Sequence, residues 1–192
     1  MKITCHMIMS VDGCLLPKYW SPLYNASSSV TEVYEAADAK LSADGWIVGR
    51  KTMAEYGADV VEEKEPMEGH KTMQTNTFIG KREGRPLAVV FDIQGRLHYK
   101  SPTLPSGEHI VAVLGSHVTR AYQKELEEIG VSYIMRTPGS KLEETQSALK
   151  HLEHDFNVKH MLLEGGAITC GNFLQMGLVD ELSMIVYPGL DG

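Results

Sequence analysis

Two glycine-containing turns and two carboxylates are the residues whose types and spacing best fit chemistry in this sequence. Glu164-Gly165-Gly166-Ala167 lies where an apolar run, residues 158–163, gives way to a predicted helix. Adjacent glycines let the backbone approach a ligand closely, and a helix N-terminus offers free N–H groups to a phosphate. The spacing is not GxGxxG, because Gly171 follows Gly166 by five residues. The segment therefore predicts either a diphosphate site or, with equal weight, only a tight connection.

A second turn, Gly49-Arg50-Lys51-Thr52, repeats this arrangement at the end of another predicted strand. Its two cations and one hydroxyl can meet phosphate oxygens at a helix N-terminus. It is not a Walker loop, because only three residues separate Gly45 from Gly49, where a Walker loop has four, and Arg50 precedes the lysine. The alternative is that Arg50 and Lys51 are solvated surface charges, as such residues commonly are.

Asp12 and Glu164 are carboxylates at the ends of two predicted strands, where an α/β sheet presents ligand-binding groups. Either one can orient a polar heterocycle or transfer a proton. Asp12 belongs to an Asp-Gly pair, which is also a frequent turn, and Glu164 can equally be a solvated loop carboxylate. We favour the functional role for Glu164 because it adjoins the glycine pair. We expect Asp12 and Glu164 to be the catalytic carboxylates.

Other chemistries have little support in the sequence. His151 and His154 are three apart on a predicted helix but have no evident third ligand, so we expect no metal site. Ser10 and Cys14 flank Asp12 without a nearby histidine or a GxSxG elbow, which argues against nucleophilic catalysis. The three cysteines form no CxxC pair, which indicates reduced thiols. The net charge of -7 disfavours nucleic-acid binding, so we expect a small-molecule partner.

Length and hydropathy bound the class of protein. A chain of 192 residues, 43% of them hydrophobic, predicts one compact domain over residues 1–192. The longest apolar runs stop far short of the roughly 20 residues that cross a bilayer, so we expect no membrane contact. The N-terminal segment lacks the apolar region and cleavage site of a secretory signal, and we expect a cytoplasmic protein.

The elements that must position these residues alternate between strands and helices. Strands are predicted at residues 2–10, 46–48, 86–91, 109–114, 131–135, 158–163 and 182–187. Helices are predicted over about 30–41, from 53 to about 57, over 119–129, from 141 toward 156 and over 170–176. Residues 17–29, 59–85 and 92–105 are predicted to be loops, with a short strand at 77–79. This order predicts an α/β fold with a mostly parallel central sheet and helices on both faces.

Three helix ends carry specific signals. Ser29 with Glu32, and Ser140 with Glu143, have the spacing of capping boxes and predict two helix starts. Gly130 has the position of a glycine that ends the helix before it.

Three motifs together resemble a known superfamily. Residues 9–13 (MSVDG), 49–52 (GRKT) and 162–182 (LLEGGAITCGNFLQMGLVDEL) occur in the order and approximate spacing of the dihydrofolate-reductase-like proteins. The sequence is most similar to the reductase domain of the riboflavin-biosynthesis deaminase/reductase, over nearly the whole chain. The third motif is specific, whereas the first two are weak separately. The resemblance implies a dihydrofolate-reductase-like fold.

The resemblance also implies a cofactor and roles for individual residues. It implies that NADPH binds, that Arg50 lies near its 2′-phosphate, and that Glu164 touches the substrate. It places Asp12 at the floor of the pocket or in the turn that borders it. It implies a homodimer. The residues expected to bind the cofactor are Gly49, Arg50, Lys51, Thr52, Gly165, Gly166, Ala167, Ile168 and Thr169.

The activity that the resemblance implies is hydride transfer from NADPH to the ribosyl imine of 5-amino-6-(5-phosphoribosylamino)uracil, or to a related pyrimidine-like or pteridine-like heterocycle. The alternatives are a dihydrofolate reductase and a non-catalytic nucleotide-binding protein. Two departures matter. The family has an Asp-Asp-Pro stretch where this sequence has residues 53–66, MAEYGADVVEEKEP. The family also continues beyond a YPGLDG motif with two closing strands, so we expect either a truncated C-terminal end or a sheet that is completed otherwise.

Overall fold

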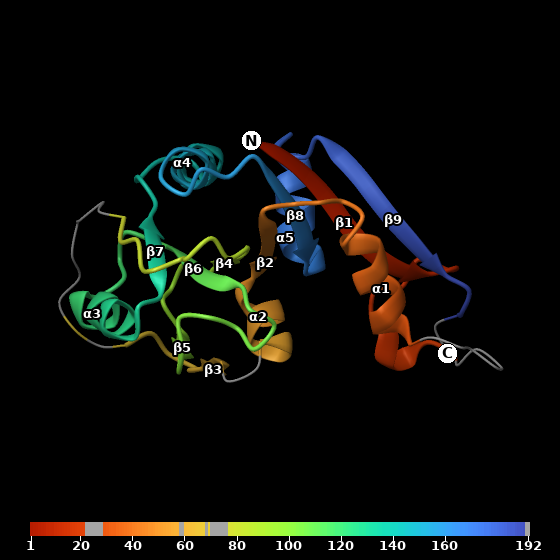
Figure 1. Cartoon of the computed structure of the whole chain (residues 1–192), viewed down its shortest axis with the longest axis horizontal. Coiled ribbons are helices and arrows are strands. Elements are labelled where there is room, and N and C mark those ends of the chain that lie inside the picture. The colour runs from red at the N-terminus through yellow and green to blue at the C-terminus, as the bar shows by residue number, and fades with distance from the viewer. Residues whose placement is uncertain (22–28, 58–59, 68, 70–76, 191–192) are drawn as a thin grey trace.

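A computed structural model describes residues 1–21, 29–57, 60–67, 69 and 77–190 of the protein. Figure 1 shows how its strands and helices are arranged. In chain order the elements are β1 (Lys2–Ser10), the short 3-10 helix η1 (Pro17–Tyr19), α1 (Val30–Asp38), β2 (Gly45–Gly49), α2 (Arg50–Tyr56), β3 (Val60–Glu62), β4 (Leu87–Phe91), β5 (Leu97–Tyr99), β6 (His109–Leu114), α3 (Arg120–Ile129), β7 (Ser132–Met135), α4 (Lys141–His154), β8 (His160–Gly165), α5 (Ala167–Gln175) and β9 (Glu181–Tyr187).

Seven strands form the central sheet in the order β7-β6-β4-β2-β8-β1-β9, from left to right in Figure 1. Every neighbouring pair in this sheet is parallel, which confirms the predicted fold class. The late strand β8 lies between β1 and β2, so the strand order reverses at this point. In open α/β sheets, ligands bind beyond the carboxyl ends of the strands at such a reversal. The topology therefore places the candidate site at the ends of β1, β2 and β8.

Helices cover both faces of the sheet because successive side chains of a strand point to opposite faces. The core under α4 and α5 includes Val89, Val113, Leu152, Leu163 and Phe173. The core under α2 and α3 includes Met53, Val90, Ala112, Tyr122 and Leu126. In the part of the chain that the structure describes, no helix is both long and apolar enough to span a membrane.

Most predicted elements are confirmed, and the differences have local causes. Both capping boxes are present, and Gly130 ends α3 in the left-handed conformation at φ +89°. The helices α2 and α5 begin three residues earlier than predicted, because glycines with no capping side chain precede them and give no sequence signal. The helix predicted over 30–41 ends at Asp38.

The predicted loops differ more. The three-residue strands β3 and β5 were not predicted, and they pair with each other in a separate two-stranded antiparallel sheet. Within the predicted strand 77–79, only Phe78 forms a β-bridge, to Tyr133. Residues 22–28, 58–59, 68 and 70–76 of the predicted loops lie outside the described residues. Runs of three residues are too short for a hydrophobic period to appear.

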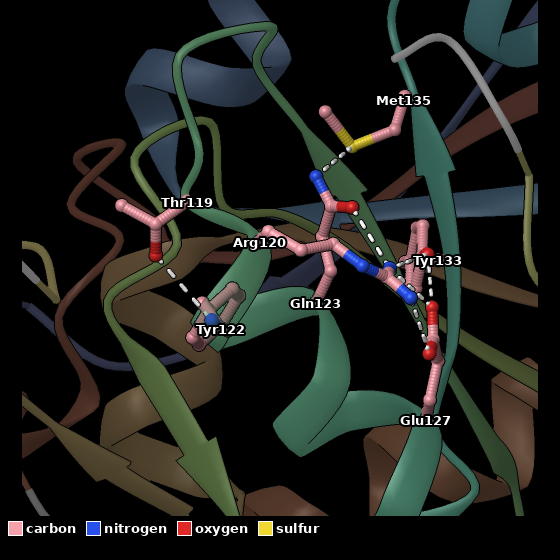
Figure 2. Close-up of polar contacts among 7 residues, drawn as sticks. All are labelled: Thr119, Arg120, Tyr122, Gln123, Glu127, Tyr133 and Met135. Atoms are coloured by element: carbon pink, nitrogen blue, oxygen red, sulfur yellow. Dashed lines mark hydrogen bonds and ion pairs between the residues drawn. The ribbon is translucent and has the colours of Figure 1, made fainter. Parts of the chain in front are cut away.

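A polar network fastens α3 to the edge strand β7 (Figure 2). Arg120 donates from both terminal nitrogens to the carboxylate of Glu127, at 2.6 and 2.9 Å. The Tyr133 hydroxyl donates to the same carboxylate at 2.7 Å, and these hydrogen bonds lower the pKa of Glu127. Thr119 caps the helix by accepting from the Tyr122 N–H at 3.3 Å. The network holds α3 in place with contacts internal to the protein.

Candidate active site

The carboxyl end of β8 carries a bulge that sets the direction of Glu164. Ile47 of β2 pairs with Leu163, but the next residue, Val48, pairs with Gly165. Glu164 is therefore the extra residue on β8, without a register partner on β2. Bulges commonly redirect a side chain next to a functional site. Here the irregularity separates Glu164 from the β2 ladder at the point where the sheet meets the glycine turn.

The two glycine turns that the sequence singled out lie against each other. A Cβ on Gly49 would lie 2.3 Å from the Thr169 Oγ1 atom, and a Cβ on Gly166 would lie 3.2 Å from the Thr52 Oγ1 atom. The turn after β2 thus contacts the turn after β8 through glycine on one side and threonine on the other. A side chain at Gly49 would fill this junction. The two segments that the sequence offered as phosphate sites therefore lie next to each other.

The start of α5 offers backbone N–H groups at this junction. Gly166 is the N-cap residue, and no side chain caps the first turn. The N–H groups of Thr169 and Cys170 bind the Gly166 carbonyl, at 2.9 and 3.1 Å. Ile168 in the same turn is 76% exposed. Gly165 has φ +124°, a conformation that favours glycine. An uncapped nine-residue helix opening toward solvent is suited to an anion.

Glu164 is a carboxyl group that keeps its proton at neutral pH. Burial raises its pKa to about 8, and the negative charges of Asp38 and Glu108 add to the effect. A hydrogen bond with Tyr34 opposes the shift only partly. A protonated carboxyl group can donate a hydrogen bond or a proton, which an ionised one cannot do. The site therefore contains an acid in the pH range where it is useful for catalysis.

Helix α1 closes the site over β1. The Tyr34 hydroxyl donates to the His6 carbonyl at 3.0 Å, and the two rings lie 4.6 Å apart. His6 is completely buried, and its Nδ1 atom lies 3.0 Å from the Ser183 Oγ atom on β9. Burial lowers the pKa of His6, so the ring is neutral at physiological pH. Among the described residues, the His6 Nε2 atom has no hydrogen-bond partner. This face of β1 is polar although it lies inside the protein.

Comparison with protein families identifies the chain. The model of the family described as the RibD C-terminal domain matches residues 1–192. The protein belongs to this family. No curated protein sequence matches it significantly.

Three solved structures show what the fold of this RibD C-terminal domain resembles. A pyrimidine reductase-like protein from Corynebacterium diphtheriae is 19% identical, with 98% of this chain and 75% of that one covered and a TM-score of 0.62. The riboflavin biosynthesis reductase Rib7 of Saccharomyces cerevisiae is 14% identical, with 100% and 74% covered and a TM-score of 0.62. RibD of Acinetobacter baumannii is 20% identical, with 100% and 47% covered and a TM-score of 0.59. These identities establish a shared fold.

The structure places Asp12 just beyond the carboxyl end of β1. Asp12 lies in an exposed turn after β1, in which the Gly13 N–H binds the Ser10 carbonyl at 2.9 Å. It shares the carboxyl edge of the sheet with Glu164. The charges that act most strongly on Glu164 come from other residues, Asp38 and Glu108. The catalytic role of Asp12 stays a prediction.

The two predicted cations differ in their surroundings. The guanidinium group of Arg50 forms an ion pair with Glu62, and its side chain is only 21% exposed. Lys51 is exposed. Arg50 is therefore held in the fold, whereas Lys51 has the solvated position that the sequence offered as the alternative.

A cavity of about 310 Å³ lies beyond the carboxyl ends of β4 and β6. Its lining includes Met67, Gln94, His117, Val118, Thr119 and Tyr122. A second cavity, of about 180 Å³, adjoins β3 and β5. Glu164 lines neither of these two cavities. The Glu164 carboxyl group and the cavity of about 310 Å³ therefore lie at different parts of the carboxyl edge of the sheet. An elongated ligand could use both.

Sequence reasoning missed the buried polar residues of β1 and the residues of α1 that act on Glu164. His6 and Thr4 are polar positions within the otherwise apolar strand β1, and both are at most 1% exposed. Such polar residues inside a buried strand are a usable signal, because buried polar groups need partners. Tyr34 and Asp38 give no such signal, since their positions depend on how α1 packs. Asp92, fully buried just after β4, was also missed; its carboxylate accepts from the Arg96 and Leu97 N–H groups and closes the turn before β5.

Proposed function

We propose that this protein is an NADPH-dependent reductase that transfers a hydride to a nitrogen heterocycle. The substrate that we favour is 5-amino-6-(5-phosphoribosylamino)uracil, reduced at its ribosyl imine. The observation that carries the proposal is the junction of the two glycine turns beside a protonated Glu164. Membership of the RibD C-terminal domain family and the names of two neighbours, a pyrimidine reductase-like protein and a riboflavin biosynthesis reductase, support a reductase of the riboflavin-biosynthesis type.

The residues at the junction fit a dinucleotide. Gly49, Thr52 and the turn from Gly166 to Thr169 would hold the diphosphate, because the start of α5 is uncapped and the absence of a side chain at Gly49 lets the two turns lie against each other. The cavity beyond β4 and β6 has a size and a mixed apolar and polar lining suited to a nucleoside. When bound, NADPH would supply the hydride. The backbone of Gly165, Ala167 and Ile168 would also contact the dinucleotide. The Arg50 side chain would face its 2′-phosphate.

Glu164 would supply the proton that the reaction needs. Reduction of a C=N bond adds a hydride at carbon and a proton at nitrogen. The Glu164 carboxyl group, protonated below about pH 8, can donate that proton or hold the ring by a hydrogen bond. Tyr34 would complete the wall of the pocket on the side of α1, with the buried His6 ring behind it. Asp12 would border the pocket from the exposed turn after β1.

We also propose that the chain forms a homodimer through β9. This strand is at the edge of the sheet, and Leu182, Met184 and Val186 on one of its faces are 62, 37 and 53% exposed. A row of exposed apolar side chains on an edge strand favours pairing with another chain. Light scattering of the purified protein should give twice the mass of one chain. A mass of one chain over a wide concentration range would disprove the dimer.

The test of function is steady consumption of NADPH with the ribosylaminouracil substrate, followed by the nicotinamide absorbance. Glu164→Gln should lower kcat by about a hundredfold, with NADPH affinity changed less than about twofold, because proton donation is lost while the diphosphate cradle is kept. Glu128→Gln on the exposed side of α3 is the matched control and should retain activity. NADPH binding without any turnover would indicate the non-catalytic alternative. Turnover of dihydrofolate instead would indicate a dihydrofolate reductase.

A further inference from the structure

The chain after β1 and the chain after β9 leave the sheet side by side. β1 and β9 are parallel neighbours, and their last residues, Ser10 and Tyr187, are register partners. A tight turn that contains Asp12 follows β1, and the Cys14 N–H closes it by donating to the Ser10 Oγ atom at 2.9 Å. The chain then passes through η1 to Trp20. We call residues 11–21 the β1 loop and residues 187–190 the β9 segment.

The β9 segment holds the β1 loop at both of its ends. At the first end, the Val11 N–H donates to the Gly189 carbonyl at 3.0 Å. At the other end, the Ser21 N–H donates to the Leu190 carbonyl at 2.8 Å, and the Leu190 N–H donates back to the Ser21 Oγ atom at 3.0 Å. A Cβ on Gly189 would lie 2.9 Å from both the Ser21 carbonyl oxygen and the Tyr187 ring. The two segments are therefore closely packed at this point.

A stack of two aromatic rings adds an apolar anchor to these hydrogen bonds. The rings of Trp20 and Tyr187 lie 5.1 Å apart at an interplanar angle of 25°. Trp20 is 8% exposed, whereas Val11, Leu16 and Tyr19 of the same loop are 59, 49 and 50% exposed. Among the described residues, the Trp20 Nε1 atom has no hydrogen-bond partner. Since burial of an unpartnered N–H group costs free energy, the contact with Tyr187 and not a hydrogen bond keeps the indole inside.

The anchored loop lies at the edge of the sheet where the candidate site is. β1 is the neighbour of β8, and the carboxyl end of β8 carries Glu164. Segments that follow the carboxyl ends of such strands contact ligands. The turn with Asp12 comes first after β1, and the Val11 contact to the β9 segment is directly beside it.

We propose that Trp20 and Tyr187 are positioning residues, which keep the turn with Asp12 against the substrate. This inference rests on the proposed function. A loop released from the β9 segment would hold the substrate-binding position for only part of the time, and the apparent affinity for the substrate falls by that fraction. The proposed dinucleotide site is formed by the turns after β2 and β8, so its affinity should not depend on the anchor.

Steady-state kinetics with the ribosylaminouracil substrate tests the proposal. Tyr187→Leu keeps an apolar side chain but removes the ring, and it should raise KM for this substrate about tenfold, with kcat changed less than about threefold. The affinity for NADP⁺ in calorimetric titration should change less than about twofold. Tyr187→Phe and Trp20→Phe each keep a ring in the stack, so KM should stay within about twofold of the parent value.

Tyr19→Ala is the matched control, because it removes an aromatic ring next to Trp20. That ring is exposed, and the Lys18 ammonium group lies 4.6 Å from its centre. KM should change less than about twofold in this variant.

Fluorescence reports the position of the loop without turnover. The chain has two tryptophans, so Trp46→Phe leaves Trp20 as the only one. Its emission should be that of a buried indole. Adding Tyr187→Leu should move the emission to longer wavelength because water reaches the ring, whereas adding Tyr19→Ala should leave it unchanged.

The outcomes separate this inference from the proposed function. If Tyr187→Leu shifts the Trp20 emission but leaves KM unchanged, the loop is released without effect on the substrate; the inference is then wrong and the proposed function stands. If KM rises while NADP⁺ affinity falls equally, the variant disturbs the whole site, and the positioning role is disproved. If Tyr19→Ala raises KM as much as Tyr187→Leu, the exposed surface of the loop and not its anchor is responsible. If the parent protein does not reduce the ribosylaminouracil substrate, both proposals fail.

Discussion

Replacing Glu164 by glutamine should make the protein more stable at alkaline pH and not at acid pH. The pKa of Glu164 is raised from its ordinary value of 4.5 to about 8, chiefly by burial. Between these values the unfolded chain releases the proton and the folded protein keeps it, so folding stability falls as pH rises. Each pH unit in this interval costs about 1.4 kcal/mol, which gives a total of up to about 5 kcal/mol. Since Glu164 is not fully buried, we expect about 2 to 5 kcal/mol.

The amide of the glutamine variant cannot ionise, so this loss should be absent from it. At about pH 5 Glu164 of the folded parent is also uncharged, so the free energies of unfolding of the parent and the variant should differ by less than about 1 kcal/mol. Near pH 8.5 the variant should be the more stable by about 2 to 5 kcal/mol. Urea unfolding followed by circular dichroism at both pH values measures the difference, with Glu128→Gln as the exposed control. A difference between parent and variant that does not depend on pH would refute the reasoning.

Three further changes test the packing of the sheet and of the helices at its carboxyl edge. Gly49→Ala should lower stability by about 1 to 3 kcal/mol because its Cβ would lie 2.3 Å from the Thr169 hydroxyl oxygen. Adding Thr169→Ala should restore most of that loss in denaturant unfolding, and no restoration would show that this contact is not the cause. Gly45→Ala should cost more than about 3 kcal/mol, since its Cβ would meet a backbone oxygen of β4 at 2.1 Å and its φ is +153°; a fall in thermal midpoint of only a degree or two would contradict this. Tyr34→Phe should cost about 1 kcal/mol by removing the 3.0 Å hydrogen bond to β1, and unchanged stability would mean that water replaces this bond.

The sequence predicted those features that depend on local signals. The capping residues Ser29 and Ser140 satisfy backbone N–H groups within one turn, so their spacing alone predicted two helix starts. The buried strands of a parallel sheet are nearly continuous apolar runs, which predicted the central sheet. The turns at Gly49 and Gly166 were recognised because glycine at a strand end before a helix lets the backbone approach a ligand, and their contact follows from the strand order.

The residues around Glu164 depend on contacts between distant segments. Tyr34 shows a role only because α1 folds over β1, and no period in its own segment reveals that. The ion pair of Arg50 with Glu62 crosses a stretch of charged residues without periodicity, where β3 is only three residues long. The elevated pKa of Glu164 comes from burial under α1, so it follows from the packed structure and not from the residue type.

The position of β8 between β1 and β2 also has a consequence for how the chain folds during synthesis. The neighbours of β1 in the sheet are β8 and β9, and the hydrogen-bonded residues Thr4 and His160 are 156 positions apart along the chain. While β2, β4, β6 and β7 can assemble as they leave the ribosome, β1 must wait, and contacts of such long range form slowly. Until β8 arrives, β1 is an unpaired strand open to aggregation. The pairing of β8 with β1 also brings Glu164 to the site. A nascent chain therefore has the Glu164 carboxyl group in place only after β8 has joined the sheet.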